Sequence, residues 1–144
     1  MTTTVGIVGL GAMGSAMAIM LIRANHAVVG YDLREAAMEE LEANGGQRAA
    51  SARAVAEAAD LVIVSLPSID AYHEALTGQG GIGSSGRSGL TVLCTCTMPV
   101  DDKKVAAERL KKLGITLLDG TVSGNRDMIL AGTLTAYVSG DRAA

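Results

Sequence analysis

Short apolar runs alternate with longer amphipathic stretches along almost the entire chain. The apolar runs predict buried strands, and the amphipathic stretches between them predict helices. Strands are predicted at residues 5–8, 28–32, 61–64, 90–93, 115–118 and 134–138, with a short extended piece at 47–49. Helices are predicted at residues 13–24, 35–43, 52–58, 68–76 and 101–113, with a short helical piece before residue 131.

Local signals mark the ends of several of these helices. Ser51 and Ser68 are good N-cap residues, with Asp70 as an alternative start for the second of the two helices. Asn25 stands where a left-handed residue ends a helix. The stretch 78–89 is rich in glycine and serine, so we expect a flexible surface loop there.

The repeated strand–helix order predicts one α/β domain over residues 1–144, with no internal repeat, coiled coil or linker. We expect a doubly wound, mostly parallel sheet of the Rossmann type with right-handed crossovers. Ligands of such sheets bind outside the carboxyl ends of the strands. The residues that directly follow the predicted strands are therefore the candidates for function.

The first predicted strand leads into a glycine turn of the form G-x-G-x-x-G at residues 9–14. Gly9 permits a tight turn, Gly11 lets the backbone approach a pyrophosphate, and Gly14 lets the helix pack closely on the strand. Asp32 follows about 20 residues later, at the end of the second strand, where a carboxylate can accept hydrogen bonds from ribose hydroxyls. This order predicts a dinucleotide site; an ordinary strand-to-helix connection is the alternative.

Composition narrows the possible functions. Hydrophobic residues make up 49% of the 144 residues and charged residues 19%, which is typical of a globular domain. The net charge is −3, and there is no basic stripe, so nucleic-acid binding is not expected. The apolar helix at 13–24 is shorter than the ~20 residues of a membrane span, and burial in a core explains it better.

Two cysteines, Cys94 and Cys96, lie two positions apart at the end of a predicted strand. They would point to the same face, which is poor geometry for a disulfide between them. The two histidines of the chain are not at metal-ligand spacing, so no metal site is expected. Unpaired thiols and the lack of a targeting segment favour the reducing cytoplasm.

Three further segments follow predicted strands: Leu66-Pro67, residues 95–99 (TCTMP) and residues 119–125 (DGTVSGN). Together with Gly-Leu-Gly-x-Met-Gly at 9–14, they resemble the β-hydroxyacid dehydrogenase family over residues 5 to about 140. This family includes 3-hydroxyisobutyrate dehydrogenase, tartronate semialdehyde reductase and 6-phosphogluconate dehydrogenase. The resemblance implies an oxidoreductase that transfers a hydride between a nicotinamide cofactor and a small 2- or 3-hydroxy acid.

The glycine turn, Asp32 and the resemblance together define the candidate site residues. The resemblance implies that Ser123, Gly124 and Asn125 bind the substrate, through its carboxylate; a plain polar turn is the alternative. The candidate cofactor-binding residues are Gly9, Leu10, Gly11, Ala12, Met13, Gly14, Asp32, Arg34, Leu66, Pro67, Thr95 and Cys96.

The choice of cofactor depends on Asp32 and Arg34. A carboxylate at the ribose repels the 2′-phosphate of NADP, so Asp32 favours NAD. Arg34 acts in the opposite direction if its guanidinium pairs with a 2′-phosphate, and it is otherwise stacked on adenine or solvated. We therefore expect NAD, with NADP as the alternative.

The chain departs from the family pattern on the substrate side. Asn125 replaces the final glycine, Gly120-Thr121 replaces Ala-Pro, and Cys96 stands where serine or threonine is expected. Reduction of a C=N bond, as in imine reductases, therefore stays open. A nucleotide-sensing regulatory module is a second alternative, although such a module has no use for the segment at 121–124.

Members of the family continue into a helical domain that supplies a catalytic lysine. The printed sequence ends at Ala144, where the connecting helix is expected to begin. Lys103, Lys104, Lys111 and Lys112 are predicted on the solvated face of a helix, so no catalytic residue is assigned within the 144 residues. We expect a cofactor domain that is inactive without the helical domain and that self-associates or binds a helical partner.

Overall fold

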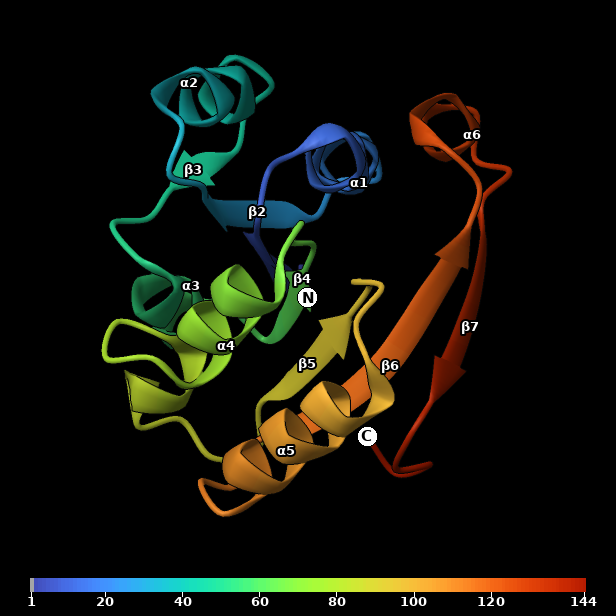
Figure 1. The fold of residues 1–144 in the computed structure, drawn as a ribbon. Coiled ribbons are helices and arrows are strands. Elements are labelled where there is room, and N and C mark those ends of the chain that lie inside the picture. The colour runs from blue at the N-terminus through green and yellow to red at the C-terminus, as the bar shows by residue number, and fades with distance from the viewer. Residues whose placement is uncertain (1) are drawn as a thin grey trace.

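The computed structural model describes residues 2–144. These residues form a seven-stranded sheet in the order β3-β2-β1-β4-β5-β6-β7 (Figure 1). Neighbouring strands are parallel except for β7, which runs antiparallel to β6. The strands are β1 (Thr4–Val8), β2 (Ala27–Tyr31), β3 (Gln47–Arg48), β4 (Leu61–Val64), β5 (Thr91–Cys94), β6 (Thr116–Ser123) and β7 (Thr135–Ser139).

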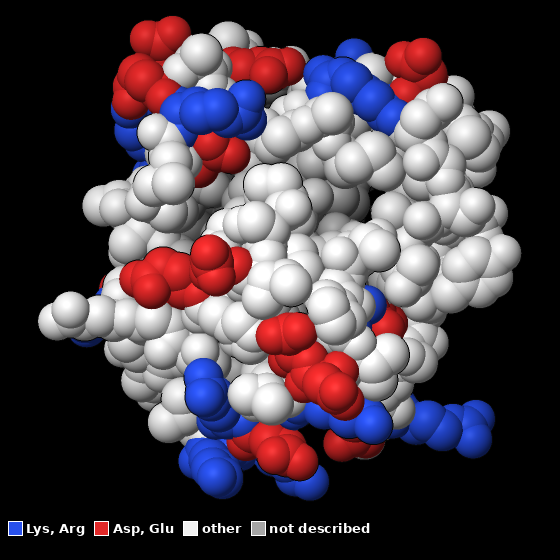
Figure 2. Space-filling model, viewed as in Figure 1, with Lys and Arg blue, Asp and Glu red and all other residues white. Residues whose placement is uncertain are grey.

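Helices cover both faces of the sheet, as a doubly wound fold requires (Figure 1). Helices α1 and α2 lie on one face, α3, α4 and α5 on the other, and the short α6 packs against α1. The bounds are α1 (Ala12–Arg23), α2 (Glu35–Ala43), α3 (Ala52–Ala58), α4 (Ile69–Thr77), α5 (Val100–Lys111) and α6 (Arg126–Leu130). Charged side chains gather near α2 and α5, and mostly uncharged atoms lie between them (Figure 2).

The predicted ends of the helices are confirmed by local geometry. Ser51 and Ser68 cap α3 and α4, because their hydroxyls accept hydrogen bonds from the amides of Ala54 and Ala71 at 3.1 and 3.2 Å. Asn25 adopts a left-handed conformation with φ of 64°, which ends α1 and turns the chain into β2.

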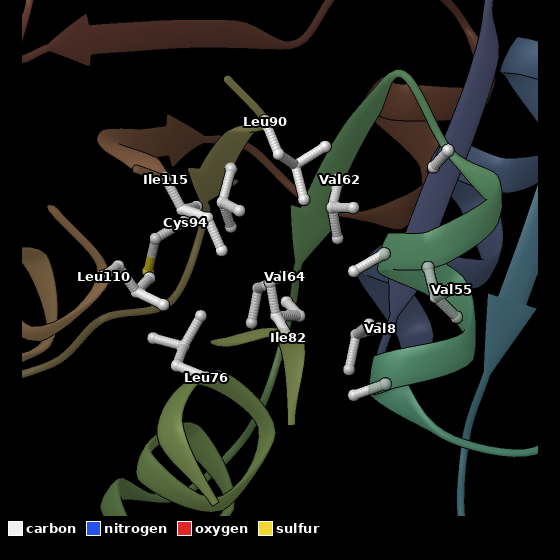
Figure 3. Packing of buried hydrophobic residues seen from close by; sticks show 14 of the residues in the cluster. Val8, Val55, Val62, Val64, Leu76, Ile82, Leu90, Cys94, Leu110 and Ile115 are labelled. Carbon is white, nitrogen blue, oxygen red and sulfur yellow. The ribbon is translucent and has the colours of Figure 1, made fainter. Parts of the chain in front are cut away.

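Aliphatic side chains fill the core on both faces of the sheet. The larger cluster lies between the sheet and helices α3, α4 and α5 and includes Val8, Val55, Val64, Leu76 and Leu110 (Figure 3). A second cluster lies under α1 and α2. The central strands lie between these two layers, and the candidate site residues are expected to meet at their carboxyl ends.

Three predictions were wrong in detail. The stretch 78–89 is not simply a surface loop, because it contains a 3₁₀ helix, η1 (Ile82–Ser85), and Ile82 is fully buried in the larger cluster. Lys103 is not on the solvated face of α5, because its ammonium group pairs with Asp119 at 2.7 Å and its side chain is only 17% exposed. In addition, β6 extends to Ser123, so part of the segment 119–125 is strand.

Candidate functional site

A cavity of about 670 Å³ opens at the carboxyl ends of β1, β2 and β4. In Figure 2 this face is recessed between the acidic side chains over α4 and the charged cluster near α2. Most of the predicted cofactor residues line it, namely Gly9, Gly11, Ala12, Met13, Asp32, Arg34, Leu66 and Pro67. Tertiary structure therefore brings together three predicted segments that are far apart in the sequence, at 9–13, 32–34 and 66–67.

The three glycines of the turn differ in what surrounds them. Gly9 has φ of 93°, and a side chain there would overlap the carbonyl of Ser65. A Cβ at Gly14 would overlap the carbonyl oxygen of Gly9, where the helix crosses closest to the strand. A Cβ at Gly11 would meet nothing within 4 Å. The fold thus requires Gly9 and Gly14, whereas Gly11 leaves open space at the beginning of α1, where helix amides can contact an anion.

Asp32 is tightly held at the edge of the cavity. One carboxylate oxygen accepts a hydrogen bond from the Leu10 amide at 2.8 Å, and the other accepts one from the Arg34 amide at 2.9 Å. Burial raises the pKa of Asp32, but the hydrogen bonds from Arg34 and Leu10 outweigh burial and place the pKa below its ordinary value. Asp32 is therefore ionised at neutral pH, as a partner for ribose hydroxyls must be.

Arg34 lies over the same turn. Its Nε contacts Asp32 at 3.1 Å, and its Nη2 donates to the carbonyl of Leu10 at 3.0 Å. The Arg34 side chain is 62% exposed, whereas the Asp32 side chain is 13% exposed. The guanidinium can therefore leave this position at little cost, while the carboxylate stays in place.

Thr95 and Cys96 do not line the cavity but hold a segment that does. The hydroxyl of Thr95 donates to the carbonyl of Val64 at 3.0 Å. The sulfur of Cys96 accepts a hydrogen bond from the Leu66 amide at 3.1 Å. These contacts fix the chain where it leaves β4, so both residues position Leu66 and Pro67 in the cavity wall.

The two thiols are buried and contact each other. A hydrogen bond with Cys96 lowers the pKa of Cys94 to about 7. The same contact, together with burial, raises the pKa of Cys96 well above its ordinary value. Cys96 therefore keeps its proton, for which Cys94 and the carbonyl of Val64, 3.4 Å from the Cys96 sulfur, are competing acceptors.

The predicted substrate residues Ser123, Gly124 and Asn125 are exposed and lie outside the cavity lining. The side-chain oxygen of Asn125 accepts a hydrogen bond from the Met128 amide at 3.0 Å and so caps α6. Arg126 then donates to the carbonyl of Ala12 at 2.9 Å and to the hydroxyl of Ser15. These contacts bring the segment next to the beginning of α1, beside the cavity.

Sequence reasoning missed several residues of the cavity wall. Ser65 and Leu33 had a usable signal, because each adjoins a predicted site residue just after a strand. Glu74 and Gly80 had none, because one lies within a helix and the other in the stretch predicted to be a surface loop. The missed residues are Val8, Tyr31, Leu33, Ser51, Ala52, Ser65, Ala71, Glu74, Ala75 and Gly80.

Three further features were sought among the residues that the structure describes: a lysine in the cavity, a metal-binding cluster and a membrane-spanning helix. No lysine belongs to the cavity lining. Residues 2–144 contain no group of three His, Cys, Asp or Glu side chains placed to hold a metal ion. None of the helices formed by these residues has both the length and the hydropathy to cross a bilayer. The described lining therefore offers the hydroxyls of Tyr31, Ser51 and Ser65 but no lysine ammonium group.

Comparison with known sequences identifies the family. The family described as the NAD binding domain of 6-phosphogluconate dehydrogenase matches residues 4–144. L-threonate dehydrogenase of Haemophilus influenzae is 32% identical over 142 residues, which are 98% of this chain and 47% of that protein. The chain spans somewhat less than half the length of the curated relatives it matches.

Similar solved structures support the same family and the same fold. A 3-hydroxyisobutyrate dehydrogenase of Mycobacterium tuberculosis superposes with a TM-score of 0.92 at 30% identity, over 99% of this chain and 48% of that one. An imine reductase of Streptomyces aurantiacus superposes with a TM-score of 0.87 at 28% identity, over 97% of this chain and 48% of that one. The Rossmann fold and the family predicted from the glycine turn and strand ends are thus confirmed. The chain belongs to the family of 6-phosphogluconate dehydrogenase NAD-binding domains, the NAD(P)-binding domains of hydroxyacid dehydrogenases.

Proposed function

We propose that this domain binds NAD(H) in the cavity and presents the nicotinamide for hydride transfer to or from a small 2- or 3-hydroxy acid. The observation that carries the proposal is the cavity itself. It joins the open backbone at Gly11, the beginning of α1 and the ionised carboxylate of Asp32. In this arrangement the helix amides bind the pyrophosphate, and Asp32 accepts hydrogen bonds from the ribose.

The substrate carboxylate is assigned to Ser123 and Gly124. A hydroxyl and a backbone amide are suitable donors for a carboxylate, and both residues are exposed beside the cavity. The solved relative from M. tuberculosis was obtained with L-serine, which is itself a 3-hydroxy acid. We expect L-serine or a related hydroxy acid to bind the NAD⁺-loaded domain weakly, and Ser123→Ala to abolish that binding in calorimetry. Absence of binding to the unsubstituted domain would contradict the assignment of the substrate carboxylate to Ser123 and Gly124.

Hydride transfer to a carbonyl also needs a proton donor. The family resemblance implies that a lysine of a helical domain is this donor, and no lysine lines the cavity, so we infer that the donor comes from polypeptide outside these 144 residues. The domain by itself is then expected to bind the cofactor without turnover. The finding of an imine reductase among the similar structures, and Asn125 on the substrate side, leave C=N reduction as the second candidate reaction.

Cofactor choice gives the most direct test. The titration would follow nicotinamide fluorescence with NADH and NADPH, and the chain contains no tryptophan to add protein background. Because the Asp32 carboxylate repels a 2′-phosphate, we expect NADH to bind about tenfold more tightly, a difference of about 1.4 kcal/mol. Asp32→Ala should remove this preference, since Arg34 is then free to pair with the phosphate. Tighter binding of NADPH to the unsubstituted domain would refute the role of Asp32.

We also infer that the domain works in a reducing compartment such as the cytoplasm. Cys94 and Cys96 are both unbridged and buried, which supports this inference.

A further inference from the structure

Cys94 and Cys96 form a pair of buried thiols behind the wall of the cavity. Cys94 is 1% exposed and Cys96 is 4% exposed, and Thr97, the next residue, is exposed. Strand β5 ends at Cys94, and Cys96 lies in the turn that follows. The two side chains are within hydrogen-bond contact. This turn therefore brings together two thiols that the spacing within a regular strand would keep apart.

The two thiols have different chemical roles. The hydrogen bond from Cys96 lowers the pKa of Cys94 to about 7, and the Tyr72 hydroxyl and the Lys103 ammonium group act in the same direction. A substantial fraction of Cys94 is therefore thiolate at neutral pH, and the thiolate is the nucleophilic form of cysteine. Cys96 keeps its proton. A nucleophilic thiolate thus lies beside a second thiol that can complete a disulfide.

The sulfur of Cys96 also holds the cavity wall. It accepts a hydrogen bond from the Leu66 amide at 3.1 Å, and it lies 3.4 Å from the carbonyl oxygen of Val64. Leu66 and Pro67 belong to the cavity lining. A reaction that moves the Cys96 sulfur therefore acts on the point where the chain leaves β4 and enters the cavity wall.

We propose that Cys94 and Cys96 form a reversible disulfide on exposure to hydrogen peroxide, and that this bond weakens cofactor binding by releasing Leu66. The effect on the cofactor rests on the proposed function, whereas formation of the disulfide does not. Transient, redox-sensing disulfides are the kind found in reducing compartments, where cellular thiols reduce them again.

The oxidation takes place in two steps. The Cys94 thiolate attacks one oxygen of the peroxide, the O–O bond breaks, and the hydroxide that leaves takes up a proton to become water. The Cys96 sulfur then attacks the sulfur of the resulting sulfenic acid. The S–O bond breaks, and its hydroxyl group leaves as water with the proton of Cys96. In total, two thiols and one hydrogen peroxide give one disulfide and two water molecules.

The new bond changes the contacts of Cys96. A sulfur–sulfur bond is about 2 Å long, much shorter than a contact between two thiols, so the Cys96 sulfur is drawn towards Cys94. It also loses the proton that it shares with the carbonyl of Val64. The Leu66 amide is then left without its acceptor, and the adjoining cavity wall is free to shift.

The test treats the domain with dilute hydrogen peroxide, removes the excess with catalase, and measures the intact mass and NADH binding. We expect the mass to fall by two hydrogen atoms and NADH affinity to fall about tenfold, as for the loss of one well-placed hydrogen bond. Dithiothreitol should restore both. This reversal separates the disulfide from oxidation of Met13 in the cavity lining, because methionine sulfoxide is reduced only by dedicated enzymes.

Two variants remove one thiol each. Cys94→Ala should bind NADH as the reduced, unsubstituted domain does, since Cys94 does not line the cavity, and peroxide should cause no loss that dithiothreitol reverses. Cys96→Ser keeps an oxygen that can accept from the Leu66 amide, and its own NADH affinity should likewise show no such loss. Either variant alone decides the point if the other fails to fold.

Hydrogen exchange of the Leu66 amide reports on the cavity wall without any cofactor, and oxidation should make this exchange faster. A gain of oxygen in place of a loss of hydrogen, or a disulfide between two copies, would overturn the proposed bond. A disulfide that left Leu66 exchange and NADH affinity unchanged would overturn its effect on the cavity. If the reduced domain failed to bind NADH, the proposed function would be refuted, while the mass and the Leu66 exchange would still decide this proposal.

Discussion

Gly11 and Gly14 belong to one motif but are expected to fail in different ways when replaced. A methyl group at position 14 would overlap the carbonyl of Gly9, whereas one at position 11 would meet open space. Gly14→Ala should therefore lower the free energy of unfolding by about 1–3 kcal/mol. Gly11→Ala should stay within about 1 kcal/mol of the original stability, yet weaken NADH binding at least tenfold by occupying the place of the pyrophosphate.

Urea unfolding followed by circular dichroism, together with NADH titration, separates the two effects. The difference between the two variants in unfolding free energy and in NADH affinity is a stronger test than either value alone. If Gly11→Ala unfolded as easily as Gly14→Ala, or bound NADH normally, the assignment of open space at position 11 to a ligand would be wrong.

Asp32 should make stability depend on pH in the acidic range. Its folded pKa is lowered because hydrogen bonds from Arg34 and Leu10 outweigh burial. A lowered pKa means that the ionised group stabilises the fold above the unfolded value of 3.8, and that this contribution is lost as pH falls through the folded pKa. The stability difference between the unsubstituted domain and Asp32→Asn should thus be constant near neutral pH and shrink below 3.8. A difference that grows on acidification would contradict this.

Among the elements, α6 depends most on contacts from outside itself. It has five residues, too few to be stable alone, and it is capped by Asn125 and tied to α1 by Arg126. The cap also gives a physical reason for asparagine where the family pattern has glycine. Ser123 is held in β6, where it pairs with Thr135 of β7, whereas the position of Gly124 and Asn125 depends on α6 staying docked on α1.

Arg126→Met should loosen this docking. The variant loses the bonds to Ala12 and Ser15, which we expect to lower the free energy of local opening of α6 by about 1–2 kcal/mol. Amide hydrogen exchange in α6 should become faster, while exchange in β4 and β5 stays unchanged. Arg142→Met is the control, because Arg142 is exposed and has no side-chain bond to any described residue. Unchanged exchange in α6 would show that Arg126 does not hold it.

On the surface of the whole domain, strand β7 differs from the central strands in being exposed along its full length. It is the last strand of the sheet, and all five of its residues are exposed, including Tyr137 at 65% and Val138 at 57%. An exposed apolar edge strand readily pairs with another chain. We propose that this is the surface on which the expected self-association or binding of a helical partner takes place.

Light scattering coupled to gel filtration would test self-association. We expect the mass to rise with protein concentration, and Val138→Lys to restore a monomer because a charge on an edge strand opposes pairing. Lys104→Glu, on the exposed surface of α5, is a suitable control for a change of surface charge. A monomer at every concentration would exclude self-association through β7. Binding of a different chain to β7 would then be the remaining expectation.

Local patterns in the sequence determined the strand–helix order, the helix caps and the glycine turn at 9–14. These features depend on neighbouring residues: apolar periodicity, the side-chain oxygens of Ser51 and Ser68, and the backbone freedom of Gly9. The position of Asp32 and Leu66 at the site could also be predicted, because carboxyl ends of parallel strands meet at one edge of a sheet.

Tertiary structure alone decided the features that depend on contacts between distant segments. Ile82 is buried in a glycine-rich stretch because α3 and neighbouring elements offer it an apolar site. Lys103 meets Asp119 only because α5 packs beside β6. Glu74 reaches the cavity because α4 begins at the same edge of the sheet as α1. Such contacts are set by how layers pack, and no periodicity within one helix or strand encodes which neighbour its side chains will meet.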